Sequence, residues 1–589
     1  MFTRKQPRRA RSMMPRRRQR GAVALVAALW IGFAMAALGA IDVGNFFYAR
    51  RTLQRTADLA ATAAAETIGS SGGCTAAGAS AQLNATANGF TADGVNKTLT
   101  TTCGRWDIST SPNFGTTGNP LNAAQVQVTQ KVPYFFLGTG YTISATGTAR
   151  ATNIDAFSLG TGLATINTQQ SALLNAILGG LLKTKVSLSV GDTQSLATAN
   201  ISLQNLMVAL NASTMQGLLN TTVTYQGLVT AMVKALQAGG DTIDATILQA
   251  LEVAIPGGQS ITIGDGGTSA PGLLALGLAS PNAAATATID VLDALMVAAQ
   301  IAQSGSNGSA GPVINVSAGL AGVASVSLQV IHPPVLAVGE GGKLANGNYR
   351  TTARTAVVNA TVTLLPVLFS SKPITIGLPP LLSVSVSALS TPLVLQLTGG
   401  LGTATLTSVD CESTKAATNA VIAVTPSITT VCLGANSSCG GAINIASISA
   451  VVAGFNIVVA SVALNGIGPL RLGPGTVPLT FNGSSGSFDS IQSANSNAVG
   501  TDASILTTQL LAALAAPGTV QVVLASIDLT SLLSQITSAV ASLLGNVLQP
   551  VFGLLDTILV PTLSLLGVQI GTATVHNMSL MCGVPQLVN

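Results

Sequence analysis

The first strongly apolar stretch of the chain runs from Gly21 to Ile41 and holds 21 residues without a charge. A helix rises about 1.5 Å per residue, so a stretch of this length crosses the roughly 30 Å hydrocarbon core of a bilayer. We therefore expect a transmembrane helix over 21–41. Apolar and Ala positions three and four apart continue to residue 64, which predicts a juxtamembrane helix over 42–70.

The charges on either side of this stretch predict its orientation. Residues 1–20 contain nine Lys and Arg and no acid, whereas Arg50, Arg51 and Arg55 follow the stretch. Basic residues beside a span stay cytoplasmic, so we expect a basic cytoplasmic tail over 1–20 and an exported body after Asp42. A cleaved signal peptide is the alternative, but its apolar region is typically about 7–15 residues and this one is longer.

The rest of the pattern switches between period two and helical spacing. Alternation at 123–131 and 141–152 predicts a small β-rich region over 71–154, with strands from about Ala76 onward. Helical spacing then dominates 155–310, interrupted by strand-like pieces at 185–190 and 259–265. Leu-rich faces at 173–182, 203–210, 225–253 and 287–301 are typical of packed helices.

Alternation returns over 311–500, most strictly at 382–389, with Pro and Gly turn signals between the runs. The final region, 501–589, predicts amphipathic helices over Ser504–Leu514 and Ser531–Leu566 and a closing strand. The expected fold class is thus a single N-terminal transmembrane helix plus an exported mixed α+β body, with helical bundle segments and a β-rich, sandwich-like domain.

Composition narrows the function classes. Charged residues make up only 8% of the chain, against about 25% in ordinary globular proteins. Beyond the first 20 residues 16 basic groups face 20 acidic ones, so the body is weakly acidic. It shows no basic patch or aromatic platform, and we expect no nucleic-acid partner.

Motifs for catalysis are also missing. The chain has no G-x-S-x-G elbow, Walker loop, H-E-x-x-H or dinucleotide fingerprint, and His332 and His576 stand outside any such motif. Lone acids in the Gly-rich runs 264–267 and 339–342 are interpreted as turn residues. We therefore predict no enzyme activity, no cofactor and no metal.

Six cysteines follow the apolar stretch, and in an oxidising compartment an even number predicts disulfides. Cys74 and Cys103 are isolated from the others and are expected to pair. The remaining four allow three connectivities. A short Gly/Asn/Ser loop favours Cys432 with Cys439, which leaves Cys411 with Cys582. The absence of CxxC, with only two His, argues against zinc or haem.

The residues after the apolar stretch carry a family resemblance. The run DVGNFFYARRTLQRTADLAATAAA, preceded by a basic tail and an apolar span, resembles the N-terminal segment of TadE/TadG-like proteins of the Flp pilus (tight adherence, Tad) assembly system. The residues that match are Asp42, Gly44, Arg50, Arg51, Leu53, Gln54, Ala57, Asp58 and Ala60.

The body is similar to the C-terminal region of some Tad-like proteins, in phrases such as AFSLGTGLATINTQQSALLNAILGGLL and the terminal GVQIGTATVHNMSLMCGVPQLV. Two departures bear on function. Val26 stands where related pseudopilins have Glu after their cleavage site, which favours a retained anchor. Residues 489–493 have Ile491 where a von Willebrand A metal loop needs Ser, so that domain is not predicted.

The resemblance implies a membrane-anchored periplasmic structural or assembly component of a Tad/Flp-type pilus system. Its partners would be the membrane, other pilus-assembly proteins or pseudopilins, and further copies of itself. It would be a single-pass protein of the bacterial inner membrane, with the N-terminus cytoplasmic and the body periplasmic or extracellular. The alternative is a cell-surface adhesin or envelope-binding protein.

Overall fold

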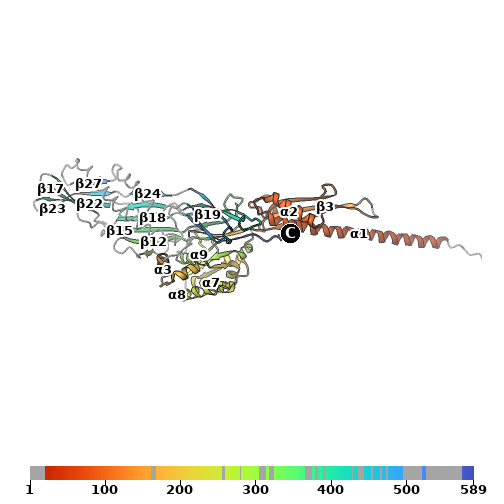
Figure 1. Cartoon of the computed structure of the whole chain (residues 1–589), viewed down its shortest axis with the longest axis horizontal. Coiled ribbons are helices and arrows are strands. Elements are labelled where there is room, and N and C mark those ends of the chain that lie inside the picture. Colours follow the sequence, from red (N-terminus) through yellow and green to blue (C-terminus); the bar gives the residue numbers. More distant parts are fainter. Residues whose placement is uncertain are drawn as a thin grey trace, which may run out of the picture.

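The computed structural model is elongated, with one long helix projecting from one end and strands at the other (Figure 1). It describes residues 20–136, 138–160, 168–254, 259–278, 280–303, 313–316, 324–364, 374–378, 382–388, 393–399, 401–426, 429–434, 443–452, 455–464, 467–472, 475–494, 520–524 and 573–588. The expected fold class is confirmed: one N-terminal long apolar helix precedes a mixed body of helices and several antiparallel sheets.

The projecting helix α1 (Arg20–Thr67) runs without a break through the expected span and the juxtamembrane segment. Its first half is exposed, whereas Ala57, Ala60, Ala61 and Ala64 are fully buried. Their small side chains let α1 lie close to a sheet formed, in the order β2-β1-β3-β4-β29, by β1 (Lys97–Trp106), β2 (Phe114–Gly115), β3 (Ala123–Val132), β4 (Tyr141–Arg150) and β29 (Gln586–Leu587).

The segment expected to begin as strand at Ala76 is instead a helix, α2 (Gly73–Ala87). Ala77, Ala81 and Ala85 recur every four residues and are all buried in one core with α1. Alanine has the strongest intrinsic helix preference, and this stripe gives α2 a face narrow enough to pack on α1. The strand prediction for this segment was therefore wrong.

A second sheet, called the central sheet below, gathers five segments from distant parts of the chain. In the order β26-β28-β5-β13-β9 it contains β5 (Ile154–Leu159), β9 (Leu274–Gly277), β13 (Leu336–Gly339), β26 (Ser490–Ala494) and β28 (Ala573–Met581). Only β13 and β9 pair in parallel. Every residue of β5 is buried, so this sheet lies between other layers.

A helical part lies to one side of the long axis (Figure 1). Its helices are α3 (Thr168–Leu182), α4 (Val190–Leu196), α5 (Leu203–Ala209), α6 (Met215–Leu219), α7 (Tyr225–Gly239), α8 (Thr242–Ala254), η1 (Pro281–Thr286) and α9 (Val291–Gln303), with short strands β6 (Asn200–Ser202), β7 (Thr222–Thr224), β8 (Ser260–Thr262) and β10 (Thr288–Asp290). Residues 291–301 of α9 are all buried, which makes α9 the centre of this part.

Residues 185–190, expected as a strand, pair with no strand among the described residues. The Asn175 side chain bonds the Leu188 N–H at 2.9 Å and the Leu188 carbonyl at 2.8 Å. One amide side chain thus supplies the hydrogen bonds that a partner strand would give.

Antiparallel strands form the remainder, as the alternating pattern predicted. One sheet has the order β11 (Val313–Val316), β12 (Ala324–His332), β15 (Val357–Leu364), β18 (Leu393–Gly399), β21 (Thr429–Gly434), β24 (Ile467–Leu472). A second has the order β16 (Ile374–Leu378), β17 (Leu382–Ala388), β22 (Ile443–Val452), β23 (Phe455–Leu464), β27 (Val520–Leu524). A third joins β14 (Thr352–Arg354), β19 (Thr403–Asp410), β20 (Asn419–Thr425) and β25 (Val477–Asn482). The helices expected at 504–514 and 531–566 lie outside the described residues.

Two disulfides lie wholly within the described residues. Cys74 pairs with Cys103 and Cys411 with Cys582, the pairings proposed from the sequence. The Cys411 N–H also donates to the Gly69 carbonyl at 2.8 Å, so this bridge lies against the end of α1. Cys432 is disulfide-bonded; Cys439, its expected partner, lies outside the described residues.

We expect Gly147→Ala to loosen the packing of α1 on β4. A Cβ at Gly147 would lie 2.6 Å from the Ala57 carbonyl carbon and oxygen, which are backbone atoms that cannot rotate away. Overpacking of this kind costs about 1–3 kcal/mol. The matched control is Gly78→Ala in α2, where nothing lies within 4 Å and the helix gains about 1 kcal/mol. Calorimetry of both variants in detergent should show a lower Tm for the first only; equal Tm values would contradict the packing.

Candidate functional site

Strand β28 places a buried histidine between two carboxylates. His576 is 5% exposed. Its Nδ1 lies 3.1 Å from Asp293 Oδ2 and its Nε2 lies 2.8 Å from Asp489 Oδ1. Asp293 comes from the first turn of α9, and Asp489 immediately precedes β26. The imidazole therefore links the helical part to two strands of the central sheet.

The start of α9 adds a third carboxylate. Asp290 Oδ1 accepts the Asp293 N–H at 2.8 Å, which is the hydrogen bond of a helix N-cap. Ser158 of β5 donates its Oγ–H to Asp293 Oδ2 at 2.6 Å. Asp290 is 1% exposed, and its Oδ2 is buried without a hydrogen-bond partner. We call Ser158, Asp290, Asp293, Asp489 and His576 the His576 cluster.

The electrostatics of the cluster follow from burial and proximity. Burial raises the pKa of Asp290 well above its ordinary value, and the neighbouring Asp293 charge acts in the same direction. Burial alone would lower the pKa of His576, but its hydrogen bonds with Asp293 and Asp489 outweigh burial and raise it. Three carboxyl groups thus face one imidazole, and the cluster favours an additional positive charge or a proton.

A second buried acid lies on the same pair of strands. Asn577 of β28 donates Nδ2–H to both oxygens of Asp155, at 2.8 and 3.0 Å, while its own Oδ1 is buried without a partner. Burial raises the pKa of Asp155 well above its ordinary value, and the Asn577 hydrogen bond only partly opposes that effect. The charged form of Asp155 is therefore disfavoured here.

The two acids in Gly-rich runs are ion-paired. Both Asp265 oxygens bond the Arg354 guanidinium, and Glu340 Oε2 lies 2.5 Å from Arg105 Nη1 with both side chains nearly buried. His332 is the last residue of β12 and pairs with Val357 beyond a register shift in the ladder. Both ring nitrogens of His576 lie beside carboxylates, Nδ1 beside Asp293 and Nε2 beside Asp489.

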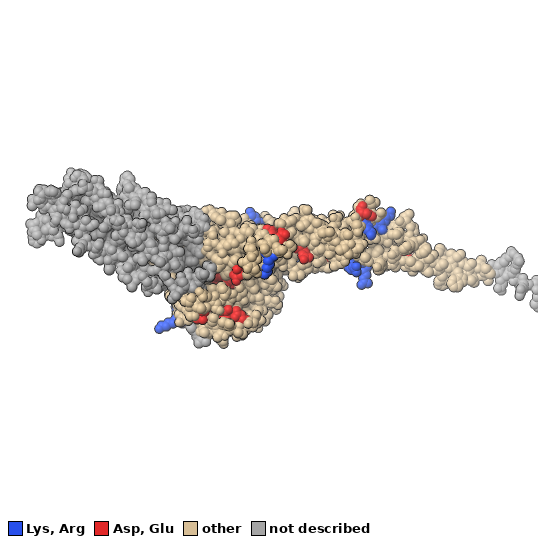
Figure 2. All heavy atoms as spheres, in the orientation of Figure 1, with Lys and Arg blue, Asp and Glu red and all other residues tan. Residues whose placement is uncertain are grey.

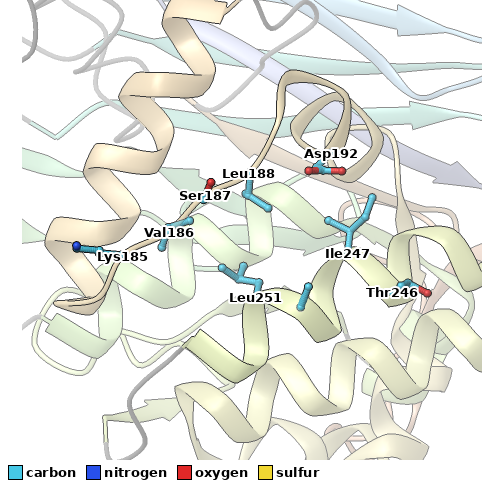
Figure 3. A pocket seen from close by; sticks show the side chains of 9 residues that line it. Lys185, Val186, Ser187, Leu188, Asp192, Thr246, Ile247 and Leu251 are labelled. Atoms are coloured by element: carbon cyan, nitrogen blue, oxygen red, sulfur yellow. The ribbon is translucent and has the colours of Figure 1, made fainter.

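A shallow hollow of about 390 Å³ lies between residues 185–192 and α8. Leu188, Ile247 and Leu251 point into it, and Lys185 and Asp192 lie toward its edge (Figure 3). It contains none of the polar clusters described above. On the face in Figure 2 the charged side chains of the described residues stand scattered rather than gathered in a basic patch. This face offers no electrostatic footprint for nucleic acid.

The residues of the TadE/TadG-like motif fall into two groups in α1. Asp42, Leu53 and Ala57 are buried, whereas Arg50 and Arg51 are exposed. Gln54 donates to the Thr146 carbonyl of β4 at 2.9 Å and to Asp58 Oδ1 at 2.8 Å. Gly44 has open space around it. Most of the motif therefore serves the contact between α1 and the sheet.

Asp42 has a separate contact. Its carboxylate accepts the backbone N–H groups of Phe135 and Phe136, at 2.8 and 3.0 Å, and Asp42 is fully buried. These residues belong to the turn between β3 and β4. The sequence motif marked Asp42, but nothing local in the sequence indicated its partner 93 residues away. The same holds for His576, whose carboxylate partners lie 283 and 87 residues away.

We expect Asp155→Asn to stabilise the protein at neutral pH. The native pKa of Asp155 is raised, so its unfavourable contribution is absent where both states are protonated, below about pH 4, and grows as pH rises toward the native pKa. An Asn at this position carries no charge, and its Oδ1 can still accept from Asn577 Nδ2. Avoiding the buried charge is worth about 1.4 kcal/mol for each pH unit between the unfolded pKa and the working pH, up to the native pKa. Thermal unfolding at pH 7.5 should show a higher Tm and at pH 4 little change; a lower Tm at pH 7.5 would contradict the assignment.

Comparison with protein families identifies three segments. Residues 21–67 match the TadE/G-like Flp pilus-assembly family, and residues 61–149 match the Tad-like Flp pilus-assembly family. Residues 170–300, the helical part, match a domain of unknown function, DUF8293. No curated protein and no solved structure matches the chain. The match over 21–67 covers the run that carried the N-terminal resemblance, whereas the Tad-like match lies at 61–149 and not at the body phrases from which a C-terminal Tad-like region was expected. The chain is accordingly Tad-like in residues 21–149.

Proposed function

We propose that the protein is a membrane-anchored, non-catalytic component of a Tad/Flp-type pilus assembly system, with its body on the periplasmic side of the inner membrane. The observation that carries the proposal is the contact between Asp42 and the β3–β4 turn, because it lies where the apolar half of α1 ends and the packed half begins.

Helix α1 supports anchoring by its length and composition. It is the one helix of the described residues that is long and apolar enough to cross a membrane, with a mean hydropathy of 2.2 over its most apolar window, and none of that window is buried. A signal sequence would satisfy the same test. A cleaved signal, however, would separate Asp42 from the apolar helix that precedes it.

The surroundings of Asp42 suit the edge of a bilayer. Phe135 and Phe136 are 64% and 52% exposed at the β3–β4 turn, and Phe47 and Tyr48 are exposed on α1. The Tyr141 ring at the start of β4 lies edge-on to the Phe46 ring, with 6.1 Å between the ring centroids. Aromatic side chains are enriched at membrane–water interfaces. We call residues 133–136 and 138–140 the aromatic turn, and we propose that it rests on the bilayer surface beside α1.

The remaining parts then project away from the membrane as an extended body. We propose that the whole chain, from tail to body, divides into units at 1–20, 21–41, 42–70, 71–154, 155–310, 311–500 and 501–589. Its partners would be other pilus-assembly proteins, pseudopilins or copies of itself. The nine basic residues of the N-terminal tail support a cytoplasmic N-terminus.

Topology and phenotype test this function together. A reporter fused after Asn589 should be active only on the exported side, and the mature protein should keep residues 21–41 by mass. A clean deletion should impair Flp pilus assembly, with plasmid-borne wild type restoring it. Normal pili in the deletion strain would refute the assembly role, and a body exposed to protease on intact cells would favour the adhesin alternative.

The chain has two tryptophans, which allow depth to be measured directly. Trp30 lies in α1 and is 71% exposed, whereas Trp106 is 7% exposed in the body. In vesicles containing brominated lipid we expect strong quenching of Trp30 in a Trp106→Phe variant. Absence of quenching of Trp30 by brominated lipid in the reconstituted protein would contradict a membrane-spanning α1.

The aromatic turn is tested in a background without either tryptophan. Phe135→Trp should be quenched by the brominated lipid. Val95→Trp is the control, because Val95 is 85% exposed in the turn before β1, whose Lys97 lies opposite Gln130 of β3. The Lys131 N–H of β3 donates to the Asn96 carbonyl, so Val95 lies near the level of Val132, and the three residues from there to Phe135 span at most about 10 Å. Equal quenching at both positions would contradict the proposed contact.

We expect Asp42→Ala to free the aromatic turn. The Phe135 and Phe136 N–H groups would lose their acceptor, at about 1–3 kcal/mol for each group left buried and unbonded. Hydrogen exchange of the aromatic turn in micelles should accelerate at least tenfold. Asp58→Asn, further along α1, is the control and should leave this exchange unchanged. Unaltered exchange in the Asp42 variant would show that the carboxylate does not hold the turn.

A further inference from the structure

We propose that the His576 cluster binds one divalent transition-metal ion through His576 Nδ1, Asp293 and Asp290. Nothing in the family matches assigns a ligand to these residues, and their motifs in the sequence predicted no metal. The three side chains are buried, and each offers a ligand atom such that all three lie within 4.8 Å of one another.

The spacing suits a small cation. His576 Nδ1 and Asp293 Oδ2 are 3.1 Å apart. Two ligand atoms about 2.0–2.1 Å from a tetrahedral zinc ion are about 3.3 Å apart, so shifts of a few tenths of an ångström would admit the ion. The hydrogen bond between His576 and Asp293 would be exchanged for two bonds to the metal.

Asp290 supplies the second, independent observation. Its Oδ1 is used by the N-cap hydrogen bond to Asp293, but its Oδ2 has no partner although the side chain is 1% exposed. A buried carboxylate oxygen without a donor is costly, and a metal ion would supply what it lacks. Helix capping explains one oxygen of this residue and leaves the other for the ion.

The surrounding hydrogen bonds match those around metal-binding histidines. A ligating imidazole normally donates its other ring N–H to a carboxylate. Here Nε2 lies 2.8 Å from Asp489 Oδ1, and Asn200 Nδ2 donates to the other Asp489 oxygen at 3.2 Å. Ser158 Oγ donates to Asp293 Oδ2 at 2.6 Å. These contacts orient His576 and Asp293. The hydrogen-bond partner of His576 Nδ1 is Asp293, which is itself a proposed ligand.

The ligand types limit which metal would bind. One imidazole nitrogen with two carboxylates suits Zn²⁺ or Mn²⁺, whereas Ca²⁺ and Mg²⁺ prefer oxygen ligands alone. The site would be structural: it would join the start of α9 to β28, and through Asp489 to the segment before β26. It would thus fix the helical part on the central sheet.

Metal content of the full-length protein is the first test, using a chain without a histidine tag. After loading with Zn²⁺ or Mn²⁺ and gel filtration, elemental analysis should find about one ion per chain. Removing it with a chelator should lower Tm, and adding the same ion back should restore it. Fewer than about 0.1 ion per chain after loading, with no change of Tm, would overturn the proposal and leave a proton as the positive charge that the cluster holds.

Two variants test which residues of the cluster bind the metal. Asp290→Asn should abolish retained metal, and Asp489→Asn should weaken affinity about 10- to 100-fold, the usual effect of removing such a partner. Asp155→Asn is the matched control, because it neutralises a buried acid on β5 outside the proposed ligand set and should retain the ion. Retention by Asp290→Asn at wild-type affinity would overturn the ligand assignment. Should Asp290→Asn fail to fold, calorimetric titration of metal-stripped wild type decides the matter, with a saturable stoichiometry of one expected.

Discussion

The antiparallel ladder between β5 and β28 is the contact on which the arrangement of this chain depends. It pairs residues 154–159 with residues 575–581, so the end of the chain returns to a strand near its beginning. β26 and β13 then add on either side. Once β28 is fixed, Cys582 lies within reach of Cys411, and β29 pairs with β4 beside α1. Residues 573–588 thereby tie the central sheet to the sheet that packs on α1.

Helix α1 combines two kinds of surface in one continuous backbone. Its first half is exposed and apolar on all sides, the composition that a helix in lipid would need, because lipid offers no polar partner. Its second half carries small residues on the face that touches the sheet and polar ones elsewhere. Gly147 brings β4 against the Ala57 backbone. The packed half of α1 and its exposed apolar half are thus one helix without an intervening linker.

Charges are scarce in this protein, and its buried ion pairs lie at junctions. Arg105 of β1 pairs with Glu340 after β13, joining the sheet that packs on α1 to the central sheet. Arg354 of β14 pairs with Asp265, which lies between β8 and β9. The His576 cluster joins α9 to β28. A buried ion pair contributes little net stability, but a displaced partner is costly. These pairs therefore favour one relative placement of the parts.

The sequence by itself determined the elements with strong local periodicity. The span, the helix that continues it, most of the alternating strands, the Tad-like motif and the pairing of Cys74 with Cys103 all follow from residues close together in the chain. Local pattern misled where tertiary packing supplied the partner: Ala77, Ala81 and Ala85 form a helix because α1 covers them, and Leu188 bonds to a side chain instead of a strand. Only the tertiary structure decided that Asp42 holds the aromatic turn and that His576 meets three carboxylates. Those contacts bridge from 87 to 286 residues of chain, and hydrophobic periodicity carries no information about which distant polar groups become neighbours.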